Sequence, residues 1–114
     1  MQYLLLIYAD ERSWATMDED TQGAEMGKCI AFSKEFADHI KGSNSLQPTT
    51  TATTVRVRNG KRLITDGPFA ETKEQLAGYY LVEAANLDEV IALAEKNPVA
   101  PHGSIEVRPV RILS

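Results

Sequence analysis

The fold depends on an apolar run near the start of the chain, where residues 2–9 read QYLLLIYA. The length of the run and its aromatic and branched side chains favour a β-strand over a helix. Apolar side chains occupy both of its faces, which is typical of a strand that is covered on both sides. We therefore expect a buried strand over residues 2–9.

A helix is predicted after this strand. Residues 10–20 are polar and acidic, and we interpret them as a connection. From about residue 23 to residue 40 apolar side chains recur at helical spacing, which predicts an amphipathic helix with Gly42 as its C-cap. The stripe consists of Cys29, Phe32, Phe36 and Ile40. Residues 43–54, rich in serine and threonine, are expected to form a loop and then enter a strand.

A β-hairpin is predicted next. Residues 53–58 alternate between apolar and basic side chains, and residues 61–64 run back from Asn59-Gly60. An Asn-Gly pair at this place favours a type I′ turn, because both residues tolerate a positive φ. We interpret the cations of this segment as a solvated face that discourages edge aggregation. They are Arg56, Arg58, Lys61 and Arg62.

The last third of the chain predicts two strands and a helix. Thr72 stands three residues before Gln75, a capping-box pattern for a short helical turn. Residues 78–84 predict a strand, and Asn86 is expected to cap a helix that ends near Pro98. Residues 104–112 alternate again and predict a final strand.

The order of these elements predicts one α+β domain over residues 1–114. It fits a ferredoxin-like split βαβ plan, with an antiparallel sheet that carries two helices on one face. The other face would stay uncovered although it is apolar, so we expect a homodimer that buries it. The alternative is that residues 10–20 or 43–52 fold over that face.

Composition narrows the classes of partner. The chain has 114 residues and a formal net charge of −4, which argues against a nucleic-acid binder. Its single cysteine, Cys29, allows no internal disulfide and no zinc site of several thiolates, and its side chain is expected to be packed in the interior and inert.

No apolar run is long enough to cross a membrane. Residues 10 and 11 are acidic, unlike a secretory signal, and we expect a cytoplasmic protein.

The sequence also resembles a known family. Residues 65–80 read TDGPFAETKEQLAGYY, which is similar to the signature of the DGPF family, a branch of the YCII-related proteins. Similar stretches occur at residues 3–8 (YLLLIY), 46–48 (LQP), 52–56 (ATTVR) and 103–110 (GSIEVRPV). The resemblance therefore extends over nearly the whole chain.

The resemblance implies a ferredoxin-like domain that pairs into a dimeric α+β barrel, with a cleft near the Asp-Gly-Pro-Phe loop. In the wider YCII-related group a His–Asp pair is proposed as catalytic, with the histidine on the first helix. The corresponding stretch here, residues 25–27, carries no histidine, and His39 lies at the helix end. The pair is therefore not carried over to this chain.

Asp66 is the first candidate for a catalytic residue. An aspartate before Gly-Pro at a strand end can point into a cleft and serve as a general base or hold a hydroxylated or cationic ligand. The alternative is an Asx-turn, in which the carboxylate accepts backbone N–H groups of its own loop.

Weaker candidates surround this loop in the sequence. Lys73 and Glu74 could bind a ligand or relay a proton, whereas Glu71 is expected to be a solvated charge. Tyr79 and Tyr80 point to opposite faces of their strand, and the outer hydroxyl could meet a ligand. His102 could carry acid–base chemistry if it approaches Asp66, or it is an exposed loop residue. The two histidines and Cys29 lack ligand spacing, so no metal is expected.

Two classes of function remain open. No phosphate-binding glycine loop or cluster of metal ligands is present, so we expect no cofactor. The first hypothesis is a cofactor-free enzyme of small molecules that catalyses proton transfer, isomerisation or a lyase step near Asp66. The second is a non-catalytic ligand-binding or regulatory module, an accessory to transcription, because the resemblance implies relatives that are joined or adjacent to sigma factors.

Overall fold

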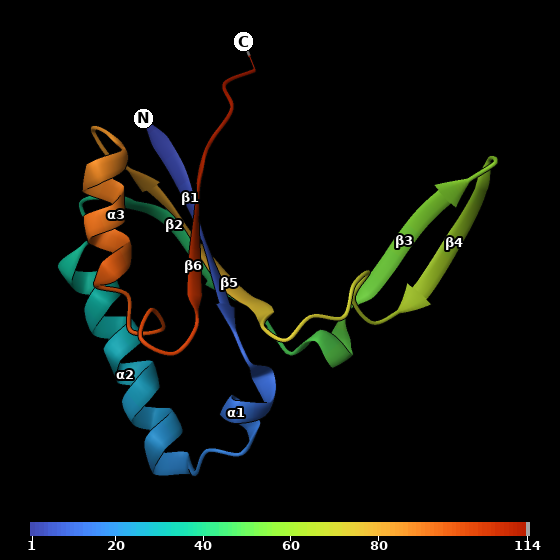
Figure 1. Cartoon of the computed structure of the whole chain (residues 1–114), viewed down its shortest axis with the longest axis horizontal. Helices are drawn as coiled ribbons and strands as arrows, with labels where there is room; N and C mark the ends of the chain where they lie inside the picture. Colours follow the sequence, from blue (N-terminus) through green and yellow to red (C-terminus); the bar gives the residue numbers. More distant parts are fainter. Residues whose placement is uncertain (114) are drawn as a thin grey trace.

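The computed structural model describes residues 1–113 and shows a four-stranded antiparallel sheet with the long helices on one side (Figure 1). The sheet consists of β1 (Gln2–Ala9), β2 (Ile40–Ser45), β5 (Gln75–Glu83) and β6 (Ser104–Pro109). The helices are α1 (Glu11–Ala15), α2 (Glu19–Glu35) and α3 (Leu87–Glu95), with a 3-10 turn, η1, at Thr49–Thr51. Strands β3 (Thr53–Arg58) and β4 (Lys61–Asp66) form a separate hairpin.

The strand order confirms the ferredoxin-like plan. The sheet runs β2-β5-β1-β6, so β1 lies in the middle and pairs antiparallel with both β5 and β6. Helix α2 connects β1 to β2, and α3 connects β5 to β6, as the split βαβ arrangement requires. The β3–β4 hairpin is inserted between β2 and β5 and takes no place in this sheet.

The core lies between the sheet and the helices. On β1, Tyr3, Leu5 and Ile7 are buried, whereas the alternate residues of the strand face away from the helices and are half-buried. The ring of Phe32 on α2 lies 5.2 Å from the ring of Tyr80 on β5, edge to face. Val90 on α3 is fully buried against the same layer. Burial of such side chains, about 1.5–3 kcal/mol each, holds the helices on the sheet.

Several predicted elements are present as expected. The strand over residues 2–9 is confirmed, and so is the hairpin turn, in which Asn59 and Gly60 have φ values of 53° and 75°. Asn86 caps α3 by accepting a hydrogen bond from the backbone N–H of Glu89 at 3.0 Å. Tyr80 faces the helices, and Tyr79 faces the other side of the sheet.

The bounds of the first long helix were predicted wrongly. Residues 10–20 are not only a connection, because they contain α1 and the first residues of α2. Each helix begins at an aspartate that caps it: Asp10 accepts from the N–H of Arg12, and Asp18 accepts from the N–H of Thr21. Helix α2 ends at Glu35, five residues before the predicted end.

Strand β2 was missed for a physical reason. Gly42, predicted to cap the helix, lies within β2 opposite Leu81 of β5. Residues 41–45 of this edge strand are polar and mostly exposed, so they lack the apolar alternation that marks a strand in a sequence. Backbone pairing with β5 holds the strand in place.

Two further predictions were wrong in detail. Thr72 and Gln75 do not open a helical turn, because Gln75 is the first residue of β5 and its amide donates to the carbonyl oxygen of Thr72. The last strand ends at Pro109 instead of residue 112. Among the described residues, no helix is both long and apolar enough to cross a membrane.

The hairpin β3–β4, here called the arm, is a distinctive feature of the molecule. Its two strands pair only with each other, and Figure 1 shows them on the side of the sheet opposite the helices. The chain has a radius of gyration of 16.1 Å, whereas a compact domain of this length is expected at about 13 Å. The arm accounts for this extended shape.

The glycine before β6 makes a close approach that generates a stability prediction. A Cβ at Gly103 would overlap the carbonyl oxygen of Tyr8 and lie 2.7 Å from Cγ1 of Val99. We expect Gly103→Ala to lower the free energy of unfolding by about 1–3 kcal/mol, because the β1–β6 edge must shift. Urea denaturation followed by circular dichroism measures the change.

Gly27 supplies the matched control. It lies inside α2, and a Cβ there would meet nothing within 4 Å. Gly27→Ala should raise the free energy of unfolding by about 0.5–1 kcal/mol, since alanine loses less backbone entropy in a helix. Equal effects of the two substitutions would contradict a steric role for Gly103.

Cys29 on α2 gives a prediction that depends on pH. The thiol is half-buried, and burial raises its pKa, with a second contribution from the Glu25 carboxylate. A raised pKa means less thiolate at pH 8, so the native protein should react several-fold more slowly with a disulfide reagent than the unfolded chain. Glu25→Gln should speed the native reaction, whereas Glu35→Gln, an exposed carboxylate at the helix end, should not. A native rate equal to the unfolded rate would contradict the raised pKa.

Candidate functional site

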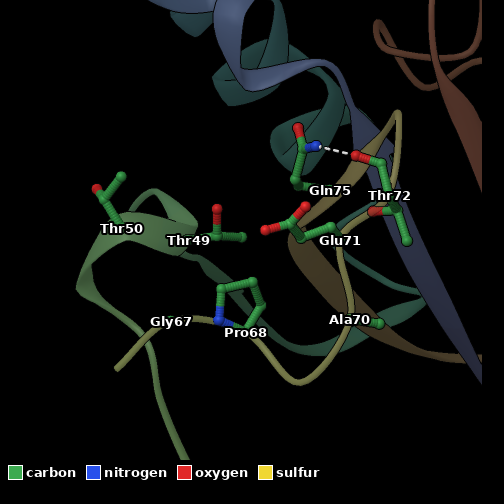
Figure 2. A pocket seen from close by; sticks show the side chains of 8 residues that line it. All are labelled: Thr49, Thr50, Gly67, Pro68, Ala70, Glu71, Thr72 and Gln75. Carbon is green, nitrogen blue, oxygen red and sulfur yellow. Dashed lines mark hydrogen bonds between the residues drawn. The ribbon is translucent and has the colours of Figure 1, made fainter. Parts of the chain in front are cut away.

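A polar hollow of about 390 Å³ lies where the arm joins the sheet. Figure 2 shows that its lining comes from η1, from the loop that follows β4 and from the start of β5. The side chains include three threonine hydroxyls, one carboxylate and one amide. The lining residues are Thr49, Thr50, Gly67, Pro68, Ala70, Glu71, Thr72 and Gln75.

Glu11 of α1 lies behind the lining of this hollow and holds two of its residues, Thr49 and Gln75. Its carboxylate accepts hydrogen bonds from the backbone N–H of Thr49 at 2.6 Å and from the Thr49 hydroxyl at 2.8 Å. Its own N–H donates to Oε1 of Gln75 at 3.0 Å, and the Gln75 amide donates to the carbonyl oxygen of Thr72. The network ties α1, η1 and β5 together, so the lining side chains have fixed positions.

The loop that follows β4 forms the opposite wall. Gly67 has a φ of 96°, a conformation that favours glycine, and its N–H donates to the carbonyl oxygen of Ala52 at 2.7 Å. Its own carbonyl oxygen accepts from the hydroxyl of Thr54 at 2.8 Å. The Asp-Gly-Pro-Phe sequence therefore makes a tight turn that returns the chain from the arm to the sheet.

Two carboxylates lie at this turn. Asp66 is the last residue of β4 and lies opposite Thr53. It precedes Gly67, which lines the hollow, but its own exposed side chain is not part of the lining. Glu71 is exposed, as expected, but it also lines the hollow, which the sequence does not predict. In Figure 2 its carboxylate lies among the side chains of Thr49, Pro68 and Gln75.

The structure does not bring His102 to Asp66. The Nε2 atom of His102 lies 3.8 Å from Oε2 of Glu25, whose other oxygen lies 3.1 Å from the Lys28 ammonium. Glu25 belongs to the stretch of α2 where relatives are expected to carry a histidine. A carboxylate and an imidazole therefore meet there, with the imidazole supplied by the loop before β6.

The two charged candidates after the loop have separate surroundings. Lys73 is exposed and is not part of the hollow's lining. Glu74 turns toward β6, where its Oε1 accepts a hydrogen bond from the Ser104 hydroxyl at 2.7 Å. His39 lies 3.5 Å from Glu89, and its Nδ1 is 3.0 Å from the carbonyl oxygen of Glu83, so it bridges β5 and α3.

The helix-free face of the sheet carries the outer tyrosines. The Asn44 amide donates to the hydroxyl of Tyr79 at 2.8 Å. The hydroxyl of Tyr8 donates to Oε1 of Glu106 at 3.3 Å, and Arg108 donates to the other oxygen at 2.9 Å. Burial, together with the Glu106 carboxylate, raises the pKa of Tyr8, and the hydrogen bond from Arg108 lowers the pKa of Glu106. The Tyr8 phenol is therefore a neutral donor at neutral pH.

The chemistry of the hollow suits a particular kind of ligand. Hydroxyl, amide and carboxylate groups accept hydrogen bonds from hydroxyl or amino groups, and a carboxylate disfavours an anion. Within residues 1–113 no three histidine, cysteine, aspartate or glutamate side chains are grouped as metal ligands. The resemblance predicted a cleft near the Asp-Gly-Pro-Phe loop, and the hollow is lined by Gly67 and Pro68 of that loop. It is also lined by Thr49 and Glu71, neither of which carries a motif that predicts a ligand contact.

The comparisons with known proteins agree with the fold. A family model described as the YCII-related domain matches residues 1–114. The chain is 37% identical to an uncharacterised protein of Rhizobium meliloti, over 98% of this chain and 94% of that protein. A solved structure, the 5-chloro-2-hydroxyhydroquinone dehydrochlorinase of Burkholderia phenoliruptrix in complex with 2,5-dihydroxybenzoquinone, is similar with a TM-score of 0.58 and 15% identity, over 97% of this chain and 94% of that one. With its whole length matched by the family model, this chain belongs to the YCII-related family.

Proposed function

We propose that this chain, as a single domain over residues 1–114, is a cytoplasmic, cofactor-free enzyme of small hydroxylated or amino-bearing molecules. It works as a homodimer, and its substrate occupies the hollow beside the Asp-Gly-Pro-Phe turn. The observation that carries the proposal is the lining itself, which gathers three threonine hydroxyls, an amide and the Glu71 carboxylate around about 390 Å³. That volume falls in the range of ordinary ligand sites.

The reaction class follows from the groups at hand. Asp66 acts as the general base and takes a proton from an acidic C–H or O–H group of the substrate. The electron pair left behind either shifts a double bond, after which Asp66 returns the proton at the other end of the shifted system, as in an isomerase, or it expels a leaving group and Asp66 releases the proton to solvent, as in a lyase. Neither route needs an external oxidant. The similarity to a dehydrochlorinase, which is one of fold, supports this choice.

The other candidate residues have smaller roles in the proposal. Tyr79 offers a hydroxyl on the helix-free face, where it accepts a hydrogen bond from Asn44. Tyr80 packs in the core and supports the strand, and Lys73 and Glu74 flank the hollow without lining it. His102 would act through Glu25 and not through Asp66, because its ring faces that carboxylate.

A second function is favoured by one observation. Asp66 and Glu71 are both exposed, and exposed carboxylates lack the desolvation that tunes a general base toward neutral pH. A ligand-binding or regulatory module, including one accessory to transcription, would need the same hollow and no proton transfer.

A thermal-shift screen of hydroxylated and amino-bearing metabolites tests the site. A ligand at about a hundred times its Kd should add about 2.7 kcal/mol to the stability of the wild type, which raises Tm by several degrees. Glu71→Gln should reduce the shift, because it removes the charge from the lining. Asp38→Asn, on an exposed loop after α2, is the matched control and should leave the shift unchanged.

Turnover then separates the two functions. The ligand found is incubated with the wild type and with Asp66→Asn, and its conversion is followed by NMR. Conversion by the wild type and binding without conversion by Asp66→Asn would support the enzyme. Binding without conversion by the wild type would favour the binding module. A shift that survives in Glu71→Gln at full size would contradict this hollow as the site.

A further inference from the structure

The arm lacks the support that a hairpin of this kind needs. Strands β3 and β4 form a two-stranded sheet of their own, and a two-stranded hairpin alone is at best marginally stable in water. Figure 1 shows the arm standing away from the four-stranded sheet. We therefore expect that the arm is stabilised by contact with a surface of another molecule.

One face of the arm carries three exposed apolar side chains, next to Arg62, which lies opposite Val57. In the register of the hairpin Val55 lies opposite Ile64, and Val57 shares their face because it is two residues from Val55. These side chains are 58%, 54% and 62% exposed in the order named. Beyond the base of the arm Phe69 is 78% exposed, and its carbonyl oxygen accepts a hydrogen bond at 3.5 Å from Arg56, which lies on the other face of the arm. A patch of this kind marks an interaction surface.

The exposed area of the chain matches what a dimer buries. The chain exposes 8347 Å², whereas a compact monomer of 12.6 kDa is expected to expose about 6200 Å². The difference is roughly 2100 Å² per chain, or about 4300 Å² for two chains, which lies in the range of permanent homodimers. A transient complex with a small partner would leave most of this additional exposed area in contact with water.

Charge favours a second copy as the occupant. The arm, residues 53–66, holds four of the 12 basic residues and one of the 16 acidic residues, so its net charge is +3. The rest of the chain is left with eight basic and fifteen acidic residues, a net charge of −7. A basic arm and an acidic body attract each other between molecules, because within one chain the arm stands away from the body.

We propose that the arm is an exchanged dimerisation arm, which lies against a second copy of this chain with the face that carries Val55, Val57 and Ile64. The helix-free face of the sheet lies on the same side of the molecule as the arm, so one two-fold pairing covers both. The second copy also shields Phe69 and thereby narrows the rim of the hollow. This inference rests on the homodimer of the proposed function, and it adds the segment that makes the contact.

The test measures association of the full-length chain by analytical ultracentrifugation between 0.1 and 100 μM (on the order of the usual dimer Kd range). We expect the wild type to sediment as a dimer of about 25 kDa, twice the 12.6 kDa chain. Val55→Lys and Ile64→Lys should each raise the dimer Kd at least about tenfold, the effect of roughly 1.4 kcal/mol. Ile30→Lys on α2 is the matched control, because Ile30 is also 58% exposed but lies on the helix side.

Each outcome decides the proposal. A weaker dimer for the arm variants, with an unchanged one for Ile30→Lys and native circular dichroism for all three, supports the arm as the contact. Arm variants that associate as tightly as the wild type overturn the arm but leave the homodimer standing. A wild type that stays monomeric at the highest concentration overturns both. The hollow is tested by a different substitution, Glu71→Gln, which lies outside the arm, so failure of the arm and failure of the hollow are measured on separate variants.

Discussion

The position of β1 in the middle of the sheet is the constraint on which the rest of the structure depends. It pairs with β5 on one side and β6 on the other, and its inward side chains Tyr3, Leu5 and Ile7 are almost wholly removed from water. No other strand contributes three buried side chains to the described core. Helices α2 and α3 pack on this side of the sheet because they shield the three inward side chains of β1 from water. Strand β1 also pairs with β6, so the first and last strands of the chain lie side by side.

The four-stranded sheet is complete without the arm, so the arm is not required for the core. The four strands β2, β5, β1 and β6 already satisfy the ferredoxin-like arrangement, so residues between β2 and β5 are not needed for the core. The chain uses that connection for η1, for the arm and for the Asp-Gly-Pro-Phe turn. Because loops on a rigid scaffold can vary without loss of the core, this is also where a binding site is most readily placed.

An element can be predicted from the sequence when it is apolar and buried, or when its turn or cap requires particular residues. The apolar run 2–9, the Asn59-Gly60 turn and the Asn86 cap carry local signals, and all three elements are present. Strand β2 carries none, because it is a polar edge strand held by backbone pairing. The same limit applies to the hollow. The turn after β4 follows from its glycine and proline, whereas the hollow brings Thr49 of η1 and Glu71 together by tertiary contact between distant segments.

The hollow and the arm share one mechanical support. Glu11 holds η1 through Thr49, and η1 leads directly into β3, so the carboxylate that fixes a lining residue of the hollow also anchors the first strand of the arm. On the other side, Gly67 is bonded to Ala52 and Thr54 at the base of that strand. Any tilt of the arm would therefore displace Thr49 and Gly67, which lie on opposite walls. A contact that fixes the arm would also fix the shape of the hollow, and this geometry would link the proposed dimer to ligand binding at the proposed site.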